Sequence, residues 1–132
     1  MAKSKCLAST AGIIVLLALA PAAIAGPGKK IAEKSASGEF AFATAQGGAK
    51  KPKNLTVRVS ADPIQTVIGS YGLFCNRGPF KFDYTDANFN QTSPYERTLK
   101  PNVRNAKRCK LYVDANLDQS GEITIELFAK RR

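Results

Sequence analysis

Clusters of basic residues are the side chains in this sequence best suited to recognise a ligand. The chain holds 20 Lys and Arg against 10 Asp and Glu, and most of the excess sits in predicted loops and tails. Such clusters attract polyanions, which outside a cell include teichoic acids, acidic polysaccharides, anionic lipids and released nucleic acid. The residues predicted to bind a polyanion are Lys50, Lys51, Lys53, Arg104, Lys107, Arg108, Lys110, Lys130, Arg131 and Arg132.

The expected binding is electrostatic and only mildly selective, with anionic polymers or cell-envelope components as partners and no specific nucleic acid. Tyr112 lies two residues from Lys110, and an aromatic ring beside a cation can stack on a base or a sugar. The alternative interpretation is that the basic residues only keep the protein soluble.

One stretch of alternating oxygen ligands resembles a calcium-binding loop. It runs Asp114-x-Asn116-x-Asp118-x-Ser120, with Glu122 close by. An EF-hand needs Gly at its sixth position and Glu at its twelfth, where this chain has Gln119 and Ile125. The sequence therefore favours a polar hairpin turn, with a weak non-EF calcium site as the alternative; no metal ligand and no cofactor is predicted.

The composition argues against most familiar catalytic sites. The chain has no His, the commonest general base near neutral pH and the commonest metal ligand. Asp83 and Asp86 could pair as acid and base, but a domain of this size can hardly build the cleft that a glycosidase needs. We predict no catalytic residue and favour a non-enzymatic secreted binding module, over a self-associating structural domain of the cell envelope and over a small enzyme with an unfamiliar site.

The first 25 residues are predicted to be a secretory signal peptide. Lys3 and Lys5 precede an apolar segment over 11–20, and Ala23-Ile24-Ala25 provides a small-x-small cleavage pattern. The apolar segment is shorter than the roughly 20 residues that span a bilayer, so we expect no membrane attachment after cleavage. The mature chain would carry 18 basic and 10 acidic residues, a net charge of +8. Residues 26–38 follow as a flexible basic leader with Ile31 as its only large apolar residue.

Export also determines how the cysteines are interpreted. With Cys6 removed, Cys75 and Cys109 remain, and an even pair in an oxidising compartment is predicted to form one disulfide. A redox-active dithiol is disfavoured because the pair lacks the Cys-x-x-Cys spacing.

The remaining residues, 39–132, show short alternating apolar runs separated by turn residues, which is typical of an all-β domain. Strands are predicted at 40–43, 55–61, 66–75, 80–84, 95–99, 109–115 and 123–129, with loops at 47–53 and 85–94 and a hairpin turn at 118–121. About seven strands with one disulfide suggest a Greek-key, immunoglobulin-like β-sandwich whose two sheets the disulfide would join across the core.

A further resemblance covers about 60 residues at the C-terminal end. Cys75 after a Gly-rich aromatic strand, Arg97 to Leu99, Cys109 and the stretch from Ser120 to Leu127 are similar to uncharacterised small secreted proteins of soil actinobacteria. This resemblance implies a small secreted domain and no particular activity.

The signal peptide and the disulfide are tested together by the mass of the secreted product. We expect a mature chain that starts at Gly26 and is two hydrogens lighter than its reduced form, because export permits Cys75 and Cys109 to be oxidised. Intact-mass spectrometry under non-reducing conditions gives both values. A mass that includes residues 1–25, or two free thiols in fresh material, contradicts the prediction.

Overall fold

The computed structural model describes residues 27–79 and 81–132, so the predicted signal peptide, its cleavage site before Gly26 and Cys6 lie outside the described residues. Within them, no helix is long and apolar enough to cross a membrane. The chain forms eight strands: β1 (Lys29–Glu39), β2 (Phe42–Lys50), β3 (Pro52–Asp62), β4 (Thr66–Gly78), β5 (Lys81–Thr92), β6 (Tyr95–Leu99), β7 (Arg108–Leu117) and β8 (Ser120–Arg131).

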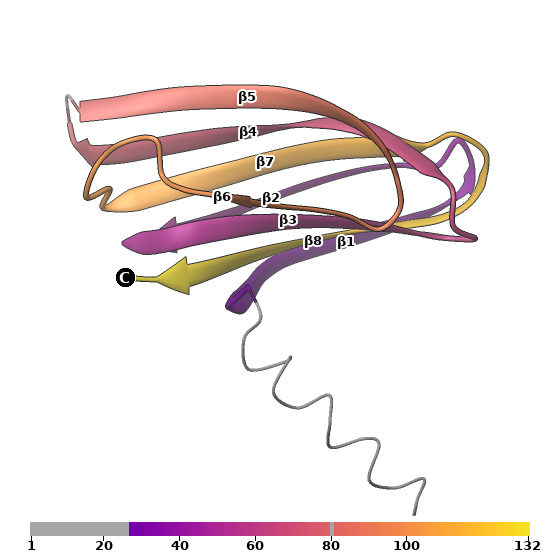
Figure 1. Ribbon diagram of the computed structural model, residues 1–132, viewed down its shortest axis with the longest axis horizontal. Coiled ribbons are helices and arrows are strands. Elements are labelled where there is room, and N and C mark those ends of the chain that lie inside the picture. Colours follow the sequence, from indigo (N-terminus) through magenta and orange to yellow (C-terminus); the bar gives the residue numbers. More distant parts are fainter. Residues whose placement is uncertain (1–26, 80) are drawn as a thin grey trace, which may run out of the picture.

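The strands form two antiparallel sheets that pack face to face (Figure 1). Sheet A has the order β1-β8-β3-β6 and sheet B the order β2-β7-β4-β5. The chain changes sheet at every connection except the β4–β5 hairpin, which is the strand order of an eight-stranded jelly roll. The predicted all-β sandwich with one disulfide is confirmed, with eight strands in place of about seven. The predicted hairpin at 118–121 is wrong, because β7 and β8 belong to different sheets.

The core lies between the two sheets and follows from the alternation within each strand. In β7, Cys109, Leu111, Val113 and Ala115 are buried while the intervening residues up to Asp114 are exposed. The inward side chains of β8 are likewise buried and fill the core from the side of sheet A. The largest buried side chains are Leu55, Leu111, Leu117, Ile123, Ile125, Leu127, Val57, Val59, Val67 and Val113. Because inward and outward side chains alternate strictly, the same pattern also determines what the outer face of each sheet presents.

The predicted flexible leader at 26–38 is wrong over most of its length. Residues from Lys29 onward form β1, which pairs with β8 from Lys29↔Ala129 to Glu39↔Ser120. Ile31, Ala32 and Ala36 also pack partly against the core. An edge strand gains stability from backbone hydrogen bonds and from these small contacts, so it needs less apolar side chain than a central strand.

Two predicted loops are also strands in the structure. Residues predicted as a loop at 47–53 continue β2 to Lys50, turn at Lys51, which has a positive φ of 46°, and start β3 at Pro52. The predicted polar loop at 85–94 is mostly the second half of β5, which pairs with β4 along its whole length. As β5 is an edge strand, most of its side chains face solvent and its sequence is accordingly polar.

The disulfide joins neighbouring strands of one sheet. Cys75 in β4 lies directly opposite Cys109 in β7, with their Cα atoms 4.0 Å apart, and both residues are buried. The prediction that it would join the two sheets across the core is therefore wrong. The bond instead fixes β7 against β4 and closes a loop that contains β5 and β6.

Removing the disulfide is expected to destabilise the domain without changing its fold. The bond spans 34 residues, for which the chain-entropy model gives about 3 to 4 kcal/mol of stabilisation. The double variant Cys75→Ala/Cys109→Ala should lose that much free energy of unfolding in guanidinium denaturation. A loss below about 1 kcal/mol would show that the disulfide constrains the unfolded chain far less than this loop length implies.

Candidate functional site

The outer face of sheet B carries the candidate site. The register of the four strands arranges its outward residues in cross-strand rows, each running in the order β2, β7, β4, β5. Four successive rows are Lys50–Arg108–Asn76–Phe82, Gly48–Lys110–Phe74–Tyr84, Gln46–Tyr112–Gly72–Asp86 and Thr44–Asp114–Ser70–Asn88. Cations lie at one end of this grid, aromatic rings in the middle and carboxylates and amides at the other end.

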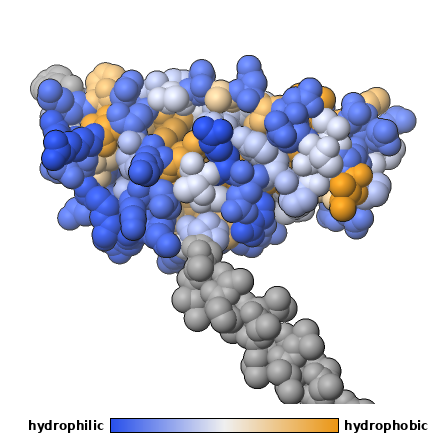
Figure 2. All heavy atoms as spheres, in the orientation of Figure 1, coloured by the Kyte–Doolittle hydropathy of each residue, from blue (hydrophilic) through white to orange (hydrophobic). Residues whose placement is uncertain are grey.

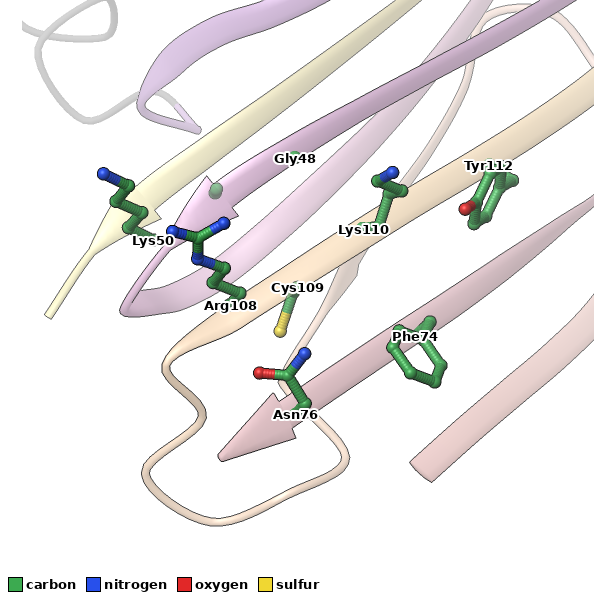
Figure 3. Close-up of a pocket in the computed structure, with 9 residues that line it drawn as sticks. Gly48, Lys50, Phe74, Asn76, Arg108, Cys109, Lys110 and Tyr112 are labelled. Atoms are coloured by element: carbon green, nitrogen blue, oxygen red, sulfur yellow. The ribbon is translucent and has the colours of Figure 1, made fainter. Parts of the chain in front are cut away.

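The first two rows enclose a shallow cavity of about 480 Å³, here called the basic hollow (Figure 3). Lys50, Arg108 and Lys110 line it together with Phe74, Asn76 and Tyr112. Gly48 stands beside Lys110 and contributes no side chain, so the space above β2 stays open. None of the three cations forms an ion pair within the part of the chain that the structure describes. The basic hollow therefore presents uncompensated positive charge next to two aromatic rings.

A second cavity of about 300 Å³, here called the polar hollow, adjoins the first. Tyr112 lines both and is 40% exposed. The ring of Tyr84 lies over Gly72, since a Cβ atom at that glycine would overlap the tyrosine ring. Gly72 thus allows Tyr84 to lie along the sheet surface, and both tyrosines line the polar hollow.

The polar hollow is lined by hydrogen-bonding groups and has no cation. Its side chains include Thr44, Ser70, Asp86, Asn88 and Asp114. The Ser70 hydroxyl donates to Asp114 Oδ1 at 3.1 Å, which orients that carboxylate along the sheet. These acceptors suit ligand hydroxyl groups, and their negative charge opposes an anion.

Sheet A presents a different outer face, on which two of the basic residues form ion pairs with glutamates. Lys30 Nζ contacts Glu126 at 2.8 Å and Glu33 at 2.7 Å, and Arg58 contacts Glu96 at 2.9 Å. These hydrogen-bonded carboxylates raise the pKa of Lys30, Glu126 contributing more than Glu33. Arg58 also stacks over Phe128, with its guanidinium carbon 4.8 Å from the ring centroid. Lys30 and Arg58 are thus paired on sheet A, whereas Lys50, Arg108 and Lys110 on sheet B form no ion pair within the described chain.

The structure brings the ten predicted polyanion-binding residues toward one end of the sandwich but divides them among several surfaces. Lys50, Arg108 and Lys110 line the basic hollow. Lys51 and Lys107 lie beside it, where the Lys51 amide donates to the Lys107 carbonyl at 2.8 Å. Hydrophilic side chains cover this end (Figure 2). The remaining predicted residues lie in strands β3 and β8, in the β6–β7 connection and at the C-terminus: Lys53, Arg104, Lys130, Arg131 and Arg132.

Arg132 has a structural role that its charge alone did not indicate. Its guanidinium donates to Asn105 Oδ1 and to the Ala106 carbonyl, both at 3.1 Å, and its amide donates to the Lys51 carbonyl at 3.0 Å. These bonds attach the end of β8 to the loop before β7 and to the β2–β3 turn.

The residues considered for acid-base and metal chemistry do not converge. Asp83 and Asp86 lie on opposite faces of β5, because their positions differ by an odd number. Asp114 and Asn116 lie on the outer face of sheet B, and Asp118 is in the connection to β8. Among the described residues, no group of three or more carboxylates or cysteines could hold a metal ion.

Sequence reasoning missed the aromatic and glycine part of the site. Phe74, Tyr84, Gly48 and Gly72 come from three strands and meet Tyr112 only through the register. The alternation in β4 placed Gly72 and Phe74 on the same face, which was the available signal, but it did not show that this face was the solvent side.

Comparisons with known proteins find a match only among solved structures. No family model and no curated protein matches the chain. TmCBM61 in complex with beta-1,4-galactotriose is similar at 9% identity over 76% of this chain and 70% of that one, with a TM-score of 0.46. A non-crystalline cellulose specific carbohydrate-binding module, CBM28, has 9% identity, 69% and 66% coverage and a TM-score of 0.40.

An enzyme is also among the similar structures. The Ruminococcus gnavus GH29 fucosidase in complex with fucose has 13% identity and a TM-score of 0.36, and the match spans 75% of this chain but 20% of the fucosidase. At these TM-scores none of the likenesses assigns a ligand or an activity to the chain.

The role of Gly72 can be tested against that of Gly69. Gly72→Ala should displace the ring of Tyr84, which is 53% exposed and can move into solvent, so the free energy of unfolding should change by less than about 1 kcal/mol. In Gly69→Ala the new Cβ meets the backbone carbonyl of Asp114 and lies 2.7 Å from Phe89, so overpacking should cost about 1 to 3 kcal/mol.

Denaturant unfolding measures both losses, and a crystal structure of Gly72→Ala shows the position of Tyr84. Equal destabilisation by the two variants, or an unmoved Tyr84, would contradict this account of the polar hollow.

Proposed function

We propose that the protein is a non-enzymatic binding module for an anionic polysaccharide, which it holds on the outer face of sheet B. The observation that carries the proposal is the basic hollow, where Lys50, Arg108 and Lys110 form no ion pair in the described chain and lie beside Phe74 and Tyr112. Cations left unpaired next to the exposed ring of Tyr112 and the half-buried ring of Phe74 combine the two groups that an acidic sugar needs.

The shape of the site supports a polymer as the ligand. The two hollows share Tyr112 and follow one another along β7, and together they are called the groove. A chain can lie along such a surface and contact several rows at once. An aromatic ring offers its apolar face to a sugar ring, while cations bind the acidic group through charge-assisted hydrogen bonds.

The geometry of the carboxylates supports binding without catalysis. Asp86 and Asp114 both line the polar hollow, but they lie two strands apart and one row apart, so strand spacing places their Cα atoms about 12 Å from each other. Both carboxylates also lie on an open face that does not exclude water.

The proposal is tested with two variants, one that removes two positive charges from the groove and one that removes two positive charges from sheet A. Arg108→Gln/Lys110→Gln should weaken binding to immobilised polygalacturonate about tenfold, since two charge-assisted contacts are lost. Lys34→Gln/Arg97→Gln removes the same charge from two exposed residues of sheet A and should change affinity less than about twofold. Biolayer interferometry at one ionic strength measures both.

Four outcomes decide the test. A loss of affinity in the groove variant alone supports the proposal. Equal loss in both variants shows that only net charge matters, and absence of binding by the parent protein at low salt shows that the cations serve solubility. Tighter binding to single-stranded DNA than to the polysaccharide at the same salt would make the ligand a nucleic acid.

A further inference from the structure

We infer that the ligand is a heteropolysaccharide in which an acidic sugar adjoins an uncharged one. The basic hollow would hold the acidic sugar, and the polar hollow, on the other side of Tyr112, would hold its uncharged neighbour. This inference rests on the proposed function and adds the order of charges along the bound chain.

The groove changes the sign of its charge on either side of Tyr112. Lys110 and Asp114 are both outward residues of β7, one on each side of Tyr112. They are four positions apart along the strand, a distance of about 13 Å, which is the length of a short oligosaccharide. When a bound polysaccharide stacks one sugar ring on Tyr112, the sugars on either side of that ring therefore meet groups of opposite charge.

The polar hollow is chemically unsuited to an anion. It is lined by the carboxylates of Asp86 and Asp114 and by the amide of Asn88, while Lys50, Arg108 and Lys110 all line the other hollow. A carboxylate or phosphate on this sugar would face two like charges, whereas hydroxyl groups could donate to both. Asp114 is already oriented by the Ser70 hydroxyl at 3.1 Å, so its second oxygen remains available to a ligand.

The aromatic groups of the polar hollow fit a flat, uncharged ring. Tyr84 and Tyr112 both line the polar hollow, and the ring of Tyr84 lies over Gly72 because no Cβ opposes it. Their rings offer apolar surface and their hydroxyls offer hydrogen bonds to the same sugar. The carboxylates and rings together select for hydroxyl-rich, uncharged chemistry.

This order of charges separates the predicted ligand from simpler polyanions. A homopolymer with an acid on every sugar, or a nucleic acid with a phosphate on every nucleotide, brings negative charge to Asp86 and Asp114. Charge density alone would favour these ligands for so basic a protein. The groove predicts the opposite preference, so the two effects can be separated by experiment.

The test compares three probes of defined charge pattern with the full mature protein. Hyaluronan alternates an acidic and a neutral sugar, polygalacturonate is acidic at every sugar, and dextran is neutral. At one ionic strength, hyaluronan should bind about fivefold more tightly per chain of equal length than polygalacturonate, because one unfavourable exposed charge contact is avoided. Dextran should bind more weakly than either.

Asp86→Asn/Asp114→Asn should remove the preference by raising the affinity for polygalacturonate to that for hyaluronan. The matched control is Asp62→Asn/Glu122→Gln, which changes the net charge by the same amount at a cross-strand pair of sheet A. This control should raise the affinity for hyaluronan and for polygalacturonate by the same factor. Denaturant unfolding and circular dichroism confirm that both variants fold.

A fourth probe, a phosphodiester-linked glycan with neutral sugars between its phosphates, distinguishes the source of the anion. If this glycan binds more tightly than hyaluronan, and Asp86→Asn/Asp114→Asn reduces its advantage over polygalacturonate, the basic hollow binds phosphate and the inference holds. If polygalacturonate binds at least as tightly as hyaluronan and the Asp86→Asn/Asp114→Asn variant leaves the ratio unchanged, the inference is wrong while the proposed function stands. If neither acidic polymer binds, the proposed function itself fails.

Discussion

The register of β7 between β2 and β4 is the constraint on which both the core and the site depend. With Cys109 opposite Cys75, Leu111 and Val113 face the core while Lys110 and Tyr112 face solvent. A slip of one residue would exchange the two sets and place a lysine in the core. The Cys75–Cys109 disulfide joins two residues that face each other directly, so it fixes this register covalently.

The two outer faces show how one fold separates stability from recognition. On sheet A, Lys30 and Arg58 form ion pairs with three glutamates of the protein itself. On sheet B the outward cations Lys50, Arg108 and Lys110 have no such partners in the described chain, and two hollows lie between the larger side chains. Surface ion pairs contribute little to stability, so leaving the sheet B cations unpaired has a small energetic cost.

Part of this structure follows from the sequence because alternation is a strong signal in central strands. It correctly placed strands at 109–115 and 123–129, which lie within β7 and β8, and identified the cysteine pair. It failed for β1 and for the second half of β5, where edge strands are stabilised by backbone pairing that polar sequences do not reveal. The jelly-roll crossovers were also missed, because a short polar turn such as that at 118–119 looks the same whether it joins partners or changes sheet.

The candidate site was predictable only in part for the same reason. Lys110 and Tyr112 are outward neighbours on one strand, so their proximity could be read from the chain. Phe74 and Tyr84 reach them from β4 and β5, and this meeting depends on a register that single-strand patterns do not contain. The ten basic residues were identified by charge, yet only three of them line the basic hollow.

Mapping ligand contacts by NMR tests the central claim most directly, namely that the outer face of sheet B is the binding face. Hyaluronan oligosaccharides titrated into isotopically labelled protein should shift amide and side-chain signals in β2, β7, β4 and β5, centred on Tyr112. Signals of Arg58 and Glu96 on sheet A should stay unchanged. Shifts confined to Lys53, Lys130 and Arg131, with none at Tyr112 or Lys110, would contradict the account.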